Sequence, residues 1–185
     1  SVPMECAEGA LDRLLRAVGG SLYGPRRERL RHLTEAMREG KLGKGRTLGG
    51  CRMLPEGEGF LLCRELRGKA AASTLTPAST FRWDGRFAIE VAPARKGSAW
   101  AKRAKGVKLG PLGAKGWSEI VGAEPGLRGK RLPAAVRVGL PALWDRRGVL
   151  AVPHLGYARE GFAKTILKRV DFRPVRPLAG PAFPV

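Results

Sequence analysis

The sequence predicts an α+β protein in which two N-terminal helices precede a small, mainly antiparallel β domain with short helical insertions. Apolar residues recur every three or four positions in the first forty residues, as on one face of a helix. After residue 45 the pattern changes to short apolar runs separated by turn residues, which is typical of hairpins. With 185 residues and 43% hydrophobic content, the chain is long enough to bury a core.

The apolar faces predict the two helices, and glycine and proline residues indicate where they begin and end. Gly19-Gly20 ends the first helix, and Pro25 suits the first turn of the second, which stops before Gly40. The apolar positions that define the faces are Ala7, Leu11, Leu14, Leu15 and Val18 in the first helix and Leu30, Leu33 and Met37 in the second.

Three hairpins are predicted in the remainder of the chain, each from two short strand-like runs around turn residues. Asp84-Gly85 supplies the positive backbone angles that a tight turn needs. The expected hairpins cover residues 47–66, 81–91 and 143–152, with a helical turn or two at 133–138 and a short closing helix or strand at 162–170.

The composition and turn signals divide the chain into three expected parts. Residues 1–44 form a helical connector, residues 45–173 form the β-rich domain, and the proline-punctuated residues 174–185 form an extended tail. The boundary near residue 44 follows from a basic, glycine-rich stretch that is typical of a connection.

The net charge of +19 and the isoelectric point near 11.1 point to a polyanionic partner, and nucleic acid is the first candidate. A membrane surface fits less well, because the basic residues lie among glycines and prolines and not on a helix with a broad apolar face. Residues 93–131 alone hold ten basic residues against two acidic ones. We therefore expect this segment to contact phosphate groups.

The candidate RNA contacts form two groups. Arginines in the first half of the second helix oppose its dipole, a small cost that bound phosphate would remove, although they also fit a solvated face balanced by glutamates. Trp100 and Trp117 could stack on unpaired bases, or could belong to the core. The predicted RNA-binding residues are Lys102, Arg103, Lys105, Lys108, Lys115, Lys130 and Arg131, with Arg26, Arg27 and Arg29 as the second area.

No catalytic, cofactor-binding or metal-binding residue is predicted. The glycines near residue 126 lack the spacing of a phosphate-binding loop. The three cysteines form no Cys-x-x-Cys pair, which indicates neither a disulfide framework nor a zinc site and favours the cytoplasm. Asp84 and Asp145 are interpreted as turn residues that bond to nearby backbone amides. His154 leaves a small hydrolase or transferase as a remote alternative, without an identifiable partner residue.

Several short motifs occur in an order that resembles the C-terminal part of bacterial tRNA(Ile)-lysidine synthetase. The resemblance covers nearly the whole chain, and no single motif carries it alone. The motifs are Gly19-Gly-Ser-Leu-Tyr-Gly-Pro-Arg-Arg-Glu-Arg-Leu30, Arg46-Thr-Leu-Gly-Gly-Cys-Arg52 with Leu61-Leu-Cys-Arg-Glu65, Trp83-Asp-Gly-Arg-Phe87, Leu140-Pro-Ala-Leu-Trp-Asp145 and Pro177-Leu-Ala-Gly-Pro-Ala-Phe183.

The resemblance implies a function for this chain as the tRNA-binding part of an ATP-dependent ligase. That family joins lysine to the wobble cytidine of a minor isoleucine tRNA, with ATP and lysine as substrates of the full-length enzyme. Its reaction belongs to a PP-loop domain with a Ser-Gly-Gly-x-Asp-Ser motif, which this sequence does not contain. We therefore expect the chain alone to be inactive and to act with such a domain in cis or in trans. The alternative is a stand-alone basic RNA-binding or ribosome-associated protein.

Overall fold

The computed structural model describes residues 2–66, 72–103 and 106–179, which separate into two compact units. Unit 1 comprises Ser1–Glu65, Asp84–Phe87 and Phe172–Val185, and unit 2 comprises Leu66–Trp83 and Ala88–Asp171. Unit 1 therefore combines three separate stretches of chain. The boundaries expected at residues 44 and 173 stay a prediction, but the first strands are grouped with the N-terminal helices in unit 1.

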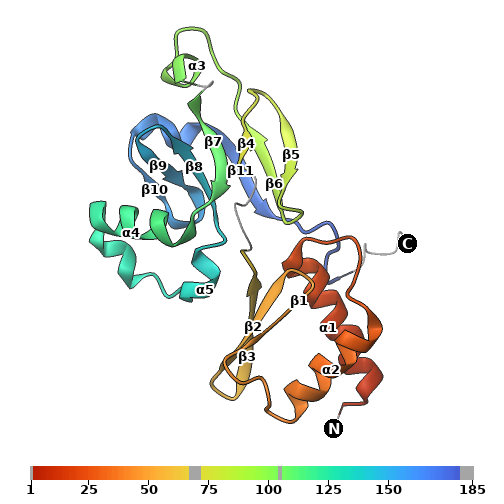
Figure 1. Ribbon diagram of the computed structural model, residues 1–185. Helices are drawn as coiled ribbons and strands as arrows, with labels where there is room; N and C mark the ends of the chain where they lie inside the picture. Colours follow the sequence, from red (N-terminus) through yellow and green to blue (C-terminus); the bar gives the residue numbers. More distant parts are fainter. Residues whose placement is uncertain (1, 67–71, 104–105, 180–185) are drawn as a thin grey trace. The chain divides into compact units, whose positions relative to one another are not determined.

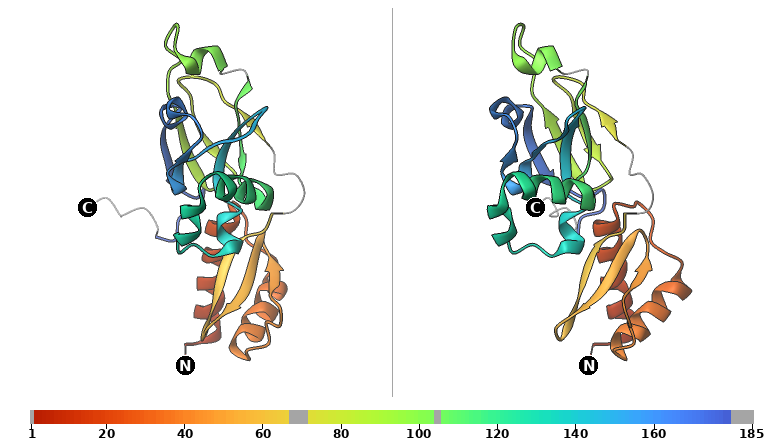
Figure 2. Two further views of the ribbon diagram at one scale, coloured as in Figure 1. Left: turned by 90° about the vertical axis from the view of Figure 1, so that its left-hand side faces the viewer. Right: turned by 60° about the vertical axis from the view of Figure 1, so that its left-hand side comes forward.

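Unit 1 packs two helices on one face of a three-stranded antiparallel sheet (Figures 1 and 2). The sheet has the order β1-β2-β3, and a tight hairpin pairs Glu56 with Gly59. Helix α1 lies against β2 and β3, and α2 lies against β1. The elements are α1 (Met4–Gly19), α2 (Arg27–Arg38), β1 (Arg46–Leu48), β2 (Cys51–Glu56) and β3 (Gly59–Arg64).

The core of unit 1 forms because both helices and the sheet each present one apolar face. Alternate residues of β2, Cys51 and Met53, point into this core, whereas Arg52 between them is exposed. Residues from α1, α2 and the loop after α2 complete the cluster, namely Leu11, Leu15, Leu30, Leu33 and Leu42.

Unit 2 contains a five-stranded antiparallel sheet of order β10-β9-β8-β7-β4 and takes most of a three-stranded sheet of order β11-β6-β5 (Figure 1). The strands are β4 (Ser73–Thr74), β5 (Thr80–Trp83), β6 (Phe87–Val91), β7 (Lys108–Pro111), β8 (Pro141–Asp145), β9 (Gly148–Val152), β10 (Tyr157–Ala158) and β11 (Leu167–Phe172). The helical elements are α3 (Ala99–Arg103), α4 (Gly113–Ala123), η2 (Pro125–Gly129), α5 (Ala134–Arg137), η3 (Pro153–Leu155) and η4 (Gly161–Thr165).

Helix α4 covers β9 and packs with it in an apolar cluster of unit 2. Ile120 of the helix and Val149 of the strand are fully buried there. The carboxylate of Glu119 accepts a 2.7 Å hydrogen bond from the backbone N–H of Val149, so the same helical turn supplies both an apolar and a polar contact. The helix is thereby fixed on the sheet.

The α+β class and the order of its elements are confirmed. The two helices end near the predicted glycines, and the three hairpins occur as β2–β3, β5–β6 and β8–β9. Asp84 and Gly85 both have positive φ, at 52° and 65°, as the turn requires. Of the expected tail, residues 174–179 are described, and Val175 donates a 2.9 Å hydrogen bond to the carbonyl of Gly85; residues 180–185 lie outside the described part.

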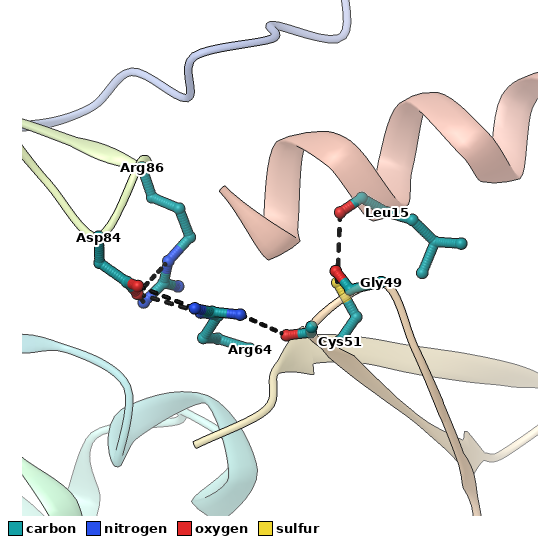
Figure 3. A network of polar contacts seen from close by, with 7 residues as sticks. Leu15, Gly49, Cys51, Arg64, Asp84 and Arg86 are labelled. Carbon is teal, nitrogen blue, oxygen red and sulfur yellow. Dashed lines mark hydrogen bonds and ion pairs between the residues drawn. The ribbon is translucent and has the colours of Figure 1, made fainter. Parts of the chain in front are cut away.

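A partly buried carboxylate connects distant segments of unit 1 (Figure 3). Asp84 accepts hydrogen bonds from Arg64 at 2.9 and 3.1 Å and from Arg86 at 2.7 and 3.0 Å. Arg64 also donates a 2.8 Å bond to the carbonyl of Gly50, where β2 begins. Arg86 is only 6% exposed. We call Arg64, Asp84 and Arg86 the ion cluster. Its ion pairs differ from the bonds to turn amides that the sequence predicts for Asp84.

The ion cluster lowers the pKa of its carboxylate. Burial alone raises the pKa of Asp84, but the hydrogen bonds and charges of Arg64 and Arg86 outweigh burial, so that pKa lies below its ordinary value. A lowered folded-state pKa contributes stability that is present above the unfolded-state value, about 3.9, and is lost as the pH falls through the folded-state value. The cluster is thus fully formed at neutral pH.

Replacing Asp84 with alanine should destabilise unit 1 strongly. The change removes the carboxylate that two largely buried guanidinium groups both contact, a loss of roughly 3–5 kcal/mol for buried pairs. Urea unfolding at pH 7 measures it. Glu35→Ala is the control, because its pair with Arg31 is largely exposed and should contribute at most about 0.5 kcal/mol. Equal effects of the two variants would contradict the role assigned to the ion cluster.

The three cysteines should differ sharply in reactivity. Cys51 and Cys63 are buried, whereas Cys6 is exposed on α1. Burial raises the pKa of Cys51 to about 12, and only the thiolate attacks an alkylating reagent. Iodoacetamide at pH 8 should therefore add one group to the native protein, on Cys6, and three groups in denaturant, counted by mass spectrometry. Rapid native labelling of Cys51 would be inconsistent with this core.

Candidate nucleic-acid interface

The loop between α1 and α2 is fixed at its start by close backbone contacts. Gly20 adopts the left-handed conformation that ends α1, and the backbone N–H of Ser21 donates a 3.1 Å bond to the carbonyl of Arg16. A side chain on Gly20 would collide with the carbonyl of Asp84. The loop therefore leaves α1 directly beside the ion cluster, in a conformation that glycine permits.

The next residues form a hollow of about 460 Å³ in unit 1, which we call the Tyr23 hollow. Tyr23 is 82% exposed. Arg26 and Arg29 are exposed as well, and among the described residues no carboxylate pairs with either guanidinium group. The full lining comprises Ser21, Tyr23, Gly24, Pro25, Arg26, Arg29, Leu48 and Gly49.

Helix geometry separates Arg27 from the two arginines beside it. Arg26 immediately precedes α2, and it lines the Tyr23 hollow together with Arg29, whereas Arg27 and Arg31 are four apart and share another side of the helix. Arg27 lines a different hollow in which four glutamates outnumber two arginines: Glu5, Glu8, Glu28 and Glu35 with Arg27 and Arg31. The predicted second area thus divides: Arg26 and Arg29 line a hollow whose lining residues include no carboxylate, and Arg27 does not.

In unit 2, Lys102 faces a second group of cations that the sequence did not select. It lines a hollow of about 480 Å³ with Arg146 and Arg147, which form the β8–β9 turn. Asp145 also lines this hollow, but its carboxylate accepts bonds from the N–H of Arg147 and from Arg159. As predicted, Asp145 therefore bonds to a turn amide. Arg103 lies in α3, and Lys105 lies outside the described residues.

A further basic hollow of about 650 Å³ in unit 2 contains Arg95, Lys164 and Lys168. Lys164 and Lys168 were missed because they come from η4 and β11, some seventy residues beyond Arg95. A salt bridge of 3.2 Å joins Lys168 to Glu90, which leaves Arg95 and Lys164 as the more available charges. The only sequence signal for them was the general excess of basic residues.

The remaining predicted contacts are spread along unit 2. Figures 1 and 2 show α3 at one end of the unit and α4 and α5 at the other. Lys108 begins β7, Lys115 lies in α4, and Lys130 and Arg131 follow η2; all four are exposed. A single phosphate could not reach all of them, and their role stays a prediction.

The two tryptophans considered as stacking platforms are placed differently. Trp100 is buried, and its indole N–H donates a 3.1 Å bond to the carbonyl of Ala92. Trp117 packs against the core of unit 2, with the guanidinium of Arg137 lying 4.1 Å from its ring centre. Trp100 is therefore a core residue, and one face of Trp117 is already covered.

The surroundings of His154 add no support for the alternative that the protein is a small hydrolase or transferase. This residue is exposed and lies in the short helical turn η3. Desolvation lowers the pKa of its ring below the ordinary value, although the charge of Asp171 acts in the opposite direction. In the described part of the chain, no three His, Cys, Asp or Glu residues are arranged to bind a metal ion, and no helix is long and apolar enough to cross a membrane.

Comparison with known proteins confirms the resemblance that the motifs indicated. A tRNA(Ile)-lysidine synthase of Ruegeria pomeroyi is 28% identical over 172 residues, which is 93% of this chain, and one of Anaplasma marginale is 36% identical over 101 residues. The matches lie in the C-terminal part of both relatives. This chain is similar to the C-terminal part of tRNA(Ile)-lysidine synthases.

The chain spans about a third of the length of the Ruegeria synthase and about a fifth of the Anaplasma synthase, at 36% and 22%. No family model matches it, and no solved structure does so. The similarity to the synthases therefore rests on the two sequence matches.

The division of the arginines on α2 predicts unequal effects on RNA binding. Arg26→Ala or Arg29→Ala should lower affinity and reduce the slope of log affinity against log salt by roughly 0.7–0.9 for each phosphate that the variant no longer binds. Arg27→Ala should change the slope little, because its guanidinium lies among glutamates. Fluorescence anisotropy with labelled tRNA over a range of salt concentrations measures all three. Equal slopes for the three variants would place the phosphate-binding residues elsewhere.

Proposed function

We propose that this chain is the tRNA-recognition part of a tRNA(Ile)-lysidine synthase. The observation that carries the proposal is the similarity over 93% of the chain to a protein of that name. The net charge of +19 leads to the same class of partner by an independent physical argument. The exposed cations of both units are the expected points of contact.

The mechanism is the positioning of tRNA through its phosphates. In unit 1, Arg26 and Arg29 offer two guanidinium groups that can each form two parallel bonds to phosphate. In unit 2, Lys102 and Arg146 lie around one hollow and Arg95 around another. Contacts of this kind set the register and orientation of the RNA but do not read its sequence.

The chemistry then belongs to a PP-loop domain that acts with this chain in cis or in trans. In the proposed reaction, ATP adenylates the wobble cytidine of a minor isoleucine tRNA and releases pyrophosphate, and an amine of lysine then displaces AMP to form the new bond. This chain contributes binding energy and orientation, which lower the barrier by placing the reacting base correctly. We propose the cytoplasm as the place where this occurs.

A general RNA-binding protein is the competing function, and the spread of cations along unit 2 favours it to some degree. Such a protein would contact RNA phosphates through the same exposed cations, without preferring one tRNA. The two functions differ in selectivity at equal charge, so RNA length and salt concentration must be matched when they are compared.

A competition binding assay distinguishes the two functions. The full chain is bound to labelled minor isoleucine tRNA at near-physiological salt, and unmodified minor isoleucine tRNA, elongator methionine tRNA or an unrelated structured RNA of equal length competes. We expect the isoleucine tRNA to compete about tenfold better, which corresponds to about 1.4 kcal/mol. Equal competition by all three would favour the general RNA-binding protein.

A further inference from the structure

The Tyr23 hollow combines an exposed aromatic residue with two exposed cations. The ring of Tyr23 is 82% exposed, although an aromatic side chain gains free energy when it is covered. Arg26 and Arg29 lie around the same hollow of about 460 Å³. This volume lies within the range of pockets that bind small molecules.

The exposed position of Tyr23 is imposed by the loop. The hydroxyl of Ser21 donates a 2.9 Å hydrogen bond to the carbonyl of Tyr23. Gly24 lies close to the tips of the Asp12 and Arg16 side chains, which would have to move to admit a larger residue, and these two side chains form a 2.7 Å salt bridge on α1. The hydrogen bonds between Ser21 and Tyr23 restrict the backbone at the tyrosine before any ligand arrives, which lowers the entropic cost of binding.

We propose that the Tyr23 hollow binds one unpaired nucleotide of RNA, with the base stacked on Tyr23 and an adjacent phosphate between Arg26 and Arg29. This inference rests on the proposed function and adds the class of RNA that unit 1 recognises. Stacking requires a base that is free of its duplex neighbours, so the occupant is single-stranded. The charges agree, because both guanidinium groups lack acidic partners among the described residues.

The basic hollow of unit 2 differs in this respect. It contains Arg95 and Lys164, but its aromatic residue, Trp100, is 4% exposed. Its indole N–H is bonded to the carbonyl of Ala92. That hollow can bind phosphate and offers no ring to a base, so we assign the unpaired nucleotide to unit 1 alone.

The test compares Tyr23→Ala with the unaltered full chain on a single-stranded oligouridine and on an RNA duplex of equal length. We expect affinity for the single strand to fall about tenfold, with an unchanged salt slope because stacking releases no counterions. Affinity for the duplex should stay the same. Tyr23→Phe should retain the affinity, because its ring can still stack.

The matched control is Phe60→Ala, which removes another exposed aromatic residue of unit 1, at the tip of the β2–β3 hairpin beside Glu58; it should leave binding unchanged. Unaltered single-strand binding by Tyr23→Ala, or an equal decrease for the duplex, would overturn the nucleotide site. The proposed function would survive that result if the unaltered chain still prefers isoleucine tRNA. Failure of the unaltered chain to bind any RNA would overturn both.

Discussion

A single carboxylate between two guanidinium groups is the interaction on which unit 1 depends. Asp84 reaches Arg64 at the end of β3 and Arg86 in its own turn, and Arg64 continues to the carbonyl of Gly50. The bonds of Arg64 connect stretches of chain that are remote in sequence. Because Gly20 lies against the same turn, the loop that carries Tyr23 starts from a point that the ion cluster fixes.

The basic residues of this protein have two different roles: some stabilise the fold, and others are available to contact RNA. Arg64, Arg86 and Arg159 are bonded to carboxylates inside the units, and Arg137 covers the ring of Trp117. Such arginines stabilise the fold and offer little to a polyanion. The net charge therefore measures the attraction of the whole molecule for RNA, whereas the contacts themselves depend on the exposed cations that have no acidic neighbour.

The sequence predicted what is local and missed what joins distant segments. Periodicity placed both helices, and turn residues such as Asp84-Gly85 placed the hairpins, because these signals act over a few residues. The hydrogen bond from Arg64 to Asp84 joins residues twenty positions apart, and no local sequence pattern predicts it. The same reason explains why no local pattern places Glu5 and Glu8 of α1 beside Arg27 or Lys164 beside Arg95.

The discontinuity of unit 1 affects how the protein is made. Its stretches Ser1–Glu65, Asp84–Phe87 and Phe172–Val185 emerge from the ribosome at different times, although domains generally fold as units during synthesis. Arg64 is translated before its counter-charge, Asp84, exists. Unit 1 consequently acquires its complete set of contacts only after Phe172–Val185 has been translated, and a nascent or truncated chain that stops after β3 carries an arginine that must remain hydrated.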